Sequence, residues 1–527
     1  GTVSHLINIG SAAGKQGNEL AIVKPLAIGI DMAVTGAGRA MGRNTQREIT
    51  AAEITPQLRG MASGFIEGLR ELPTIMRTGV ALDDATKLDR VRAGFGANVP
   101  GIGRAGNEAI NFAVEAPLRA LTAEDTMMKS MARGGHVMEL ATRQAVKEGA
   151  TDVAARAAQI VSEPSRYWRL FEQADELAKK DVFQEDRALS SWMMHGKQLG
   201  GVPGVVINAA VPFVKTPVNI AAQGLEMTPV GFISALKSAR AGNRGEAEMQ
   251  AARAMFGSTL LYGGWSLGKE GFLTAGTPED DTERSTLPNG WKPWSVRLPM
   301  SNGEALYVNY ANLGPMGMPL AAGAIIADAQ RRGEDMSEWL PKTAISVGQY
   351  MGDQTFLQGL SDFARAFREP QRYGENLTEG FATQWVPYAA MQRQIQQALG
   401  MAQRDPHNAM EALLATSPVT AGMVPERQDR LGRTVYPTQT GVGAVITPAR
   451  YGVEQPDPVM SALRRAGIGI GQPPTRITSG DGREIQLTRA EQSQFQRAMG
   501  RELLLRLDEL RDPDPTTRQK TAERVMA

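Results

Sequence analysis

Residues 211–232, VPFVKTPVNIAAQGLEMTPVGF, decide the interpretation of the fold, because two Thr-Pro steps divide an otherwise apolar helical stretch. Proline removes a backbone donor and clashes with the preceding helical turn, so Pro217 and Pro229 each predict a kink or the first turn of a new helix. The segment between them, which contains Asn219, is too short to span a bilayer. It carries no catalytic side chain, and we expect Pro217, Asn219 and Pro229 to have an architectural role.

The composition excludes several kinds of site. The chain has 527 residues, with 57 basic and 56 acidic side chains, and a net charge of +1. This balance argues against a dedicated polybasic nucleic-acid surface but leaves a local basic patch open. It has no cysteine, which excludes disulfides, thiolate metal sites and cysteine nucleophiles. The 57 glycines and 25 methionines suit closely packed helices. Because the chain begins at Gly1, we expect a processed chain or part of a longer polypeptide.

Residues 45–78 show apolar positions at three- and four-residue steps, which predict a helix. Gly60, Gly64 and Gly68 recur every fourth residue on it and would form a ridge of small residues that lets another helix approach closely. We expect that contact either within the chain or across a subunit boundary. Charged neighbours such as Arg59 and Glu67 argue against a membrane helix.

Further along, residues 107–198 predict several helices, with a break at Gly134-Gly135. An apolar helix over 245–268 precedes a β-hairpin, in which residues 294–298 and 306–310 alternate in hydropathy around an Asn-Gly turn at 302–303. Helices are expected again at 315–332, 337–351, 355–367 and 381–401.

From about residue 405 the sequence is rich in proline, glycine and loops. The exceptions are a short helix over 457–466, a hairpin turning at Asp481-Gly482 and a terminal helix over 488–510, after which the last residues are expected to be loosely held. The predicted fold class is therefore mainly α: an elongated multi-helix protein with one small β-hairpin near the middle and a loop-rich C-terminal part. Its expected segments are 1–106, 107–270, 271–404 and 405–527.

The sequence predicts no catalytic, metal or cofactor site. The four histidines, His5, His136, His195 and His407, lack metal-ligand spacing, so each is expected to be an isolated surface or packed residue. The GxGxxG at 101–106 does not follow a strand, so it does not indicate a dinucleotide site. No secretory signal and no convincing membrane span is expected.

Aromatic residues gather around the predicted hairpin, including Trp291 and Trp294. A small core under the hairpin is the favoured interpretation. A membrane-interface belt or a partner-docking patch stays open.

Several of these pieces together resemble one family. The 211–232 stretch is similar to a "PF-x-x-TP-x-N-I … TP-x-G" signature of phage internal virion and polyvalent proteins, followed there by an apolar helix, a "G-x-x-T-G-x-x-P" step and a "GW-x-P-x-S" hairpin. Here residues 271–278 read GFLTAGTP and residues 290–295 read GWKPWS. The helical tract at 115–149 is similar to the same family, and the likeness covers about residues 1–500.

The resemblance implies a DNA-ejection protein, packaged in the capsid and then placed in the host cell envelope. It implies a homo-oligomer that forms a channel or core stack, with other ejection, core, portal or tail proteins as partners. Non-specific contact with phage DNA and contact with the envelope membrane are further expectations. A peptidoglycan-degrading virion enzyme fragment and a membrane-inserted pore subunit are the alternatives.

Overall fold

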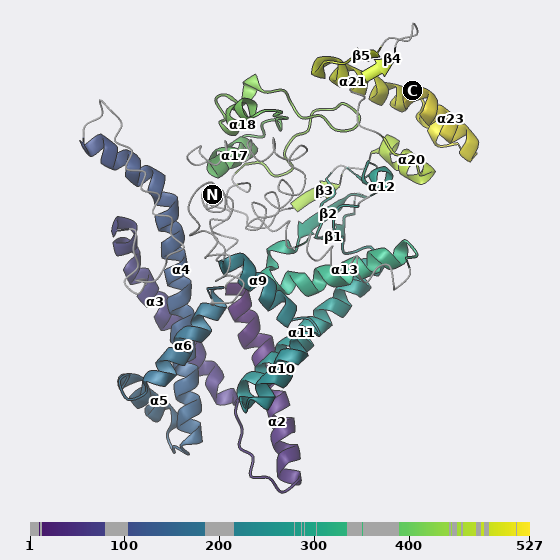
Figure 1. Ribbon diagram of the computed structural model, residues 1–527. Helices are drawn as coiled ribbons and strands as arrows, with labels where there is room; N and C mark the ends of the chain where they lie inside the picture. The colour runs from purple at the N-terminus through teal and green to yellow at the C-terminus, as the bar shows by residue number, and fades with distance from the viewer. Residues whose placement is uncertain are drawn as a thin grey trace. The chain divides into compact units, whose positions relative to one another are not determined.

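The computed structural model describes residues 10, 13–78, 104–184, 215–278, 280–285, 287–288, 290–301, 303–334, 350, 389–441, 444, 451–454, 457–470, 476–478, 484–512 and 514–526. In this part of the chain the fold is mainly helical, with antiparallel sheets of three and two strands and a loop-rich C-terminal part (Figure 1). The predicted mainly α class is confirmed. The helices predicted at 355–367, and most of that at 337–351, lie outside the described residues.

The chain divides into two compact units, which we describe separately. The helical unit comprises residues 4–266 and 311–368, and the mixed unit comprises residues 1–3, 267–310 and 369–527. Both units are discontinuous in sequence and cut across the four segments expected from the sequence. That division into segments stays a prediction.

The helical unit contains a series of helices of very different lengths. They are η1 (Glu19–Val23, a π-helix), α2 (Lys24–Ala40), η2 (Ala51–Glu53), α3 (Ile54–Thr78), α4 (Arg104–Lys147), α5 (Val153–Ser162), α6 (Trp168–Asp181), α9 (Lys215–Glu226), α10 (Gly231–Arg240), α11 (Arg244–Lys269), η3 (Ala311–Met316) and α13 (Gly317–Arg331).

Helices α3 and α4 run antiparallel and side by side, and the predicted glycine ridge lies at their contact (Figure 1). A Cβ atom at Gly60 would collide with the carbonyl oxygen of Gly134, and one at Gly64 with that of Ser130. At Gly68 a Cβ atom would come within 2.7 Å of the Cα atom of Met127. The ridge therefore brings α3 against α4 of the same chain, and a role for it in assembly stays a prediction.

The break predicted at Gly134-Gly135 is wrong, because α4 continues without interruption from Arg104 to Lys147. Gly134 lies against the backbone of Gly60, and a Cβ atom at Gly135 would come within 2.6 Å of Met61 Cγ. Each glycine inside a helix costs about 1 kcal/mol relative to alanine. Here the close helix contact offsets that cost, which helical propensity alone does not reveal.

The 211–232 stretch is described from Lys215 onward. Pro217 is the third residue of α9, within its first turn, and Pro229 lies in the turn between α9 and α10. Asn219 is fully buried, and its side-chain Nδ2 donates a hydrogen bond to the carbonyl oxygen of Phe183 at 2.9 Å. This hydrogen bond connects α9 to Phe183, two residues after the end of α6.

The mixed unit combines short strands with C-terminal helices. Its elements are α12 (Asp281–Ser285), β1 (Ser295–Pro299), β2 (Ala305–Asn309), α17 (Ala389–Ala398), α18 (Ala409–Thr416), η4 (Ala421–Met423), β3 (Tyr451–Glu454), α20 (Pro458–Ala466), β4 (Arg476–Thr478), β5 (Glu484–Gln486), α21 (Arg489–Leu505), α22 (Leu507–Leu510) and α23 (Pro515–Met526).

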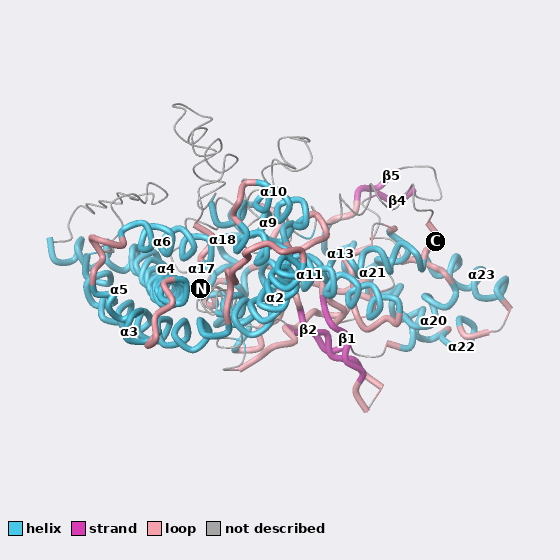
Figure 2. Tube along the Cα trace, turned by 90° about the horizontal axis from the view of Figure 1, so that it is seen from below, coloured by secondary structure: helices cyan, strands magenta, loops and turns pink. Residues whose placement is uncertain are grey.

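The predicted β-hairpin is confirmed. Strands β1 and β2 pair antiparallel, with Val296 opposite Val308, and they lie side by side (Figure 2). Strand β3, from about 140 residues further along the chain, pairs with β2 as an unpredicted third strand and places Tyr307 opposite Gly452. The second predicted hairpin pairs β4 with β5, and its turn at Asp481-Gly482 lies outside the described residues.

The aromatic residues near the hairpin belong to different environments. Trp294 and Tyr310 are buried, and the ring of Trp294 packs on Gly276, where a Cβ atom would lie 2.9 Å from the indole. Trp291 is half-buried, and its backbone N–H donates to the Pro288 carbonyl. Trp265 instead belongs to the helical unit.

The expectation that the last residues are loosely held is wrong. Residues 515–526 form α23, and Ala522 on it is fully buried in an apolar cluster with Leu463 of α20, Leu503 of α21 and Leu510 of α22. This segment is charged and proline-rich, so its sequence does not indicate that Ala522 and Val525 pack against the apolar cluster.

We predict that Gly64→Ala destabilises the helical unit by about 1–3 kcal/mol, because the new methyl group collides with the backbone of Ser130. Gly29→Ala is the matched control: Gly29 lies inside α2 with no neighbouring atom within 4 Å of a Cβ, so this variant should gain up to about 1 kcal/mol. Urea unfolding followed by far-UV circular dichroism measures both. Equal stability of the two variants would contradict the close contact.

Candidate functional site

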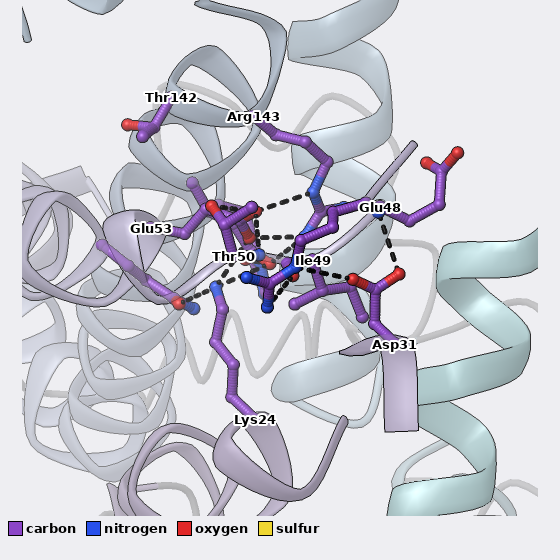
Figure 3. A network of polar contacts seen from close by, with 12 residues as sticks. Lys24, Asp31, Glu48, Ile49, Thr50, Glu53, Thr142 and Arg143 are labelled. Atoms are coloured by element: carbon purple, nitrogen blue, oxygen red, sulfur yellow. Dashed lines mark hydrogen bonds and ion pairs between the residues drawn. The ribbon is translucent and has the colours of Figure 1, made fainter. Parts of the chain in front are cut away.

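The most distinctive feature of the helical unit is a lysine buried between two carboxylates (Figure 3). Lys24 is 2 % exposed, and its Nζ atom lies 3.3 Å from Glu53 and 2.9 Å from Glu139. It also donates a hydrogen bond to Gln57 at 2.7 Å. A buried charge costs several kcal/mol unless it is paired, so this cation requires both partners in place.

Arg143 supplies the second positive charge of this cluster. Its guanidinium donates to Glu53 and to Glu139 at 2.8 Å each. Burial favours the protonated form of Glu139, but the positive charges of Lys24 and Arg143 and the hydrogen bond from His136 hold its pKa well below the usual range. Two cations and two anions thus join α2, η2 and α4.

Asp31 forms a second centre on the same face of α2, two helical turns after Lys24. It is fully buried and accepts hydrogen bonds from Arg244 at 2.8 Å and from Arg47 at 3.2 Å. The backbone N–H of Glu48 donates to it at 3.0 Å (Figure 3). These contacts hold the loop before η2 and the first turn of α11 against α2.

Glu248 lies beside this second centre, one helical turn after Arg244, which donates to it at 2.7 Å. Burial and the nearby carboxylate of Asp31 together raise the pKa of Glu248 to about 7, against the opposing effect of the hydrogen bond from Arg244. Two carboxylates that share one guanidinium therefore compete for it.

His136 connects α4 to the end of α6. Its Nδ1 atom lies 2.9 Å from Glu139 and its Nε2 atom 2.9 Å from Asp181. Burial alone would lower the pKa of His136, but its hydrogen bonds to the two carboxylates raise it to about 9. The ring is therefore an imidazolium at neutral pH, and both N–H groups donate. Lys15 pairs with Asp181 from the other side at 3.2 Å.

This arrangement is suited to holding helices together. Each carboxylate of this network is engaged by at least one cation. The described residues contain no group of three or more His, Asp or Glu side chains arranged to hold a metal ion. Each of the four histidines was expected to be an isolated surface or packed residue. His136 is packed, but it is not isolated, because it bonds to Glu139 and Asp181 within the network. His407 is exposed and lies 3.1 Å from Asp405, whereas His5 and His195 lie outside the described residues.

A second set of close glycine contacts was missed by the sequence reasoning. A Cβ atom at Gly257 of α11 would collide with the carbonyl oxygen of Met227, one at Gly264 with that of Leu320, and one at Gly323 of α13 with that of Leu261. The seven-residue spacing of Gly257 and Gly264 on one helix is the signal that could have indicated this contact.

Helix α2 turns Lys24 and Asp31 inward and leaves two large apolar side chains at the surface. Met32 and Val34 are 45–56 % exposed, and Ile22 of the preceding η1 is 41 % exposed. The other large apolar residues of α2, Leu26, Ile28 and Ile30, are partly buried against the core. Of the described helices, only the stretch Ala13–Ala40 is long and apolar enough to cross a membrane, by length and composition alone. The sequence predicted no convincing span, because charged residues such as Lys24 and Asp31 interrupt this run. In the structure these two residues occupy one buried face of the helix.

Comparisons with known proteins found no family model, no curated protein and no solved structure that matches the chain. The resemblance to phage internal virion proteins therefore stays a prediction from sequence motifs.

We predict that the helical unit loses stability as pH rises from about 6.5 to 9. The folded state keeps the proton on His136 that the unfolded state releases above its ordinary pKa of 6.5, so the free energy of unfolding falls through this window. The shift corresponds to a loss on the order of 3 kcal/mol. Denaturant unfolding at a series of pH values measures it.

His136→Gln should flatten this pH dependence, because glutamine carries no proton that is lost in this window. His407→Gln is the matched control and should keep the wild-type profile, since His407 lies outside the network. An unchanged slope in His136→Gln would contradict the assignment of the proton to this ring.

Proposed function

We propose that this chain is a structural, non-enzymatic phage virion protein that is ejected into the host envelope and oligomerises into a channel or core stack for genome delivery. Its partners are further copies of itself and other ejection, core, portal or tail proteins. It resides in the capsid before infection and in the host cell envelope afterwards. The motifs around residues 211–232 and 271–295 support the family, and the surface of the helical unit supports assembly.

The outward apolar face of α2 is the observation that carries the assembly part of the proposal. A second exposed apolar group lies on and before α10, where Val230, Phe232, Ile233 and Leu236 are 42–57 % exposed. Exposed apolar patches of this kind mark surfaces that another molecule covers. The charged face of α2 is already used inside the unit, so further copies of the chain are the covering partners that we propose.

The buried core also suits a protein that must unfold to leave a capsid. Among the residues that the structure describes, alanine is the commonest buried apolar residue, as at Ala141, Ala145 and Ala157 of one cluster. A small side chain contributes little hydrophobic free energy. The chain has no cysteine and hence no disulfide that would resist unfolding.

A membrane-inserted pore subunit is the second candidate, favoured by the length and apolar composition of Ala13–Ala40. Arg39 lies at the end of this stretch and Arg43 follows it, where basic side chains would meet anionic lipid headgroups. In this candidate, lipid rather than a second copy covers the outward face of α2.

The proposal is tested on particles purified from cells in which the gene is expressed with its natural neighbours. Quantitative mass spectrometry, normalised to the major capsid protein, should find several copies of the chain per DNA-filled particle and a large loss after DNA release. Absence of the chain from DNA-filled particles would overturn the proposal, and equal amounts before and after release would overturn ejection.

The double variant Met32→Glu/Val34→Glu tests which partner covers α2. Under the leading proposal it should shift the purified chain from oligomer to monomer in analytical ultracentrifugation, while the wild type stays unbound in a liposome flotation assay. Leu58→Glu on α3, equally exposed, is the control and should assemble normally. Flotation of the wild type in high salt, lost in the double variant, would favour the pore subunit instead.

A further inference from the structure

A polar groove of about 1240 Å³ opens in the helical unit, and neither the charge network nor the proposed assembly surface accounts for it. Side chains of α4, α6 and the residues around the start of α11 line it, with Glu48 from the loop before η2. Seven arginine and lysine side chains face three glutamates along its walls. The groove is therefore basic, although the chain as a whole is almost neutral.

The mouth of the groove carries two aromatic rings between two arginines, in the sequence Arg166-Tyr167-Trp168-Arg169. The guanidinium carbon of Arg166 lies 5.6 Å from the ring centre of Tyr167, and that of Arg169 lies 5.3 Å from that of Trp168. Arg156 donates to the Tyr167 hydroxyl at 2.7 Å. These contacts hold the rings in place at the surface.

Trp168 is 54 % exposed, although a tryptophan gains more free energy from burial than almost any other side chain. Its neighbour Arg166 is 70 % exposed and forms an ion pair with the exposed Glu163, 3.3 Å away. Its charge also acts on Glu148. An exposed ion pair of this kind contributes at most about 1 kcal/mol, so a phosphate could replace Glu163 at little cost.

The deeper basic residues differ from those at the mouth. Arg143 and Arg244 are engaged with Glu53, Glu139 and Asp31, so they position the wall and are not available to a ligand. The three lining lysines are also paired: Lys147 with Glu48 at 2.6 Å, Lys179 with Asp175 at 2.9 Å and Lys180 with Glu226 at 3.8 Å. The cations offered to a ligand are therefore those beside the aromatic rings. Basic side chains interleaved with exposed aromatic rings form the arrangement that binds unpaired nucleic acid bases and their phosphates.

We propose that this groove binds single-stranded nucleic acid, with a base stacked on Trp168 and the flanking phosphates against Arg166 and Arg169. The groove is larger than the 300–1,000 Å³ typical of small-molecule pockets, which suits a strand of several nucleotides. Duplex bases are already stacked on one another and cannot reach Trp168. The proposal does not depend on the virion function, because it rests on the groove alone.

The test uses the full chain and a fluorescently labelled fifteen-nucleotide oligothymidylate, with binding measured by anisotropy at low and moderate salt. Trp168→Ala should weaken binding about tenfold, the scale expected for the loss of one stacked base. Arg166→Gln/Arg169→Gln should weaken it and reduce its salt dependence, since fewer counterions are released. A duplex of the same length should bind more weakly.

Two variants control for a general loss of aromatic or positive groups. Tyr262→Ala removes an aromatic ring of α11 that is 64 % exposed, and Arg43→Gln removes an exposed positive charge after α2. Neither residue lines the groove. Both should bind as the wild type does. Because Trp168, Arg166 and Arg169 are exposed, their variants should keep the wild-type circular dichroism spectrum.

The proposal fails if the oligonucleotide does not bind at low salt, or if Trp168→Ala binds like the wild type. Equal competition by heparin, which has no bases, together with full binding by Trp168→Ala, would identify only a non-specific attraction of polyanions and would also overturn it. These outcomes leave the presence of the chain in virions untouched, so the two proposals fail separately.

Discussion

The buried ammonium group of Lys24 is the constraint on which the helical unit depends. It must meet Glu53 and Glu139 at the same time, and Arg143 must neutralise the remaining charge of both carboxylates. Apolar contacts are non-directional and tolerate many arrangements of the helices, whereas a buried ion pair is favourable in only a few arrangements. The network therefore specifies where α2, η2 and α4 lie, more than it adds to their stability.

The glycine ridge makes this geometry attainable. Gly60 and Gly64 bring the backbone of α3 onto that of α4, and η2, which carries Glu53, leads directly into α3. With Lys24 and Asp31 turned toward these partners, α2 leaves the apolar side chains of Met32 and Val34 at the surface. The burial of Lys24 and Asp31 inside the unit thus determines which side of α2 forms the surface that we propose for assembly.

The sequence predicted features whose cause is local. The hairpin follows from strand alternation and an Asn-Gly turn, and the spacing of Gly60, Gly64 and Gly68 indicates a close helix contact but not its partner. The charge network was not predictable, because Lys24 and Glu139 are separated by more than a hundred residues. The break predicted at Gly134-Gly135 is wrong for the same reason. The helix is continuous there because these glycines pack against α3, which is distant in sequence.

The most direct test of this account compares the free energy of unfolding of Lys24→Met and Lys147→Met. Lys147 pairs with Glu48 at the surface, with 39 % of its side chain exposed, so it is a matched lysine outside the buried cluster. Removing Lys24 should cost about 3–5 kcal/mol, because it leaves a buried carboxylate pair short of one cation. Removing Lys147 should cost no more than about 1 kcal/mol. If urea unfolding shows equal, small losses of the free energy of unfolding for the two variants, the central role of Lys24 is contradicted.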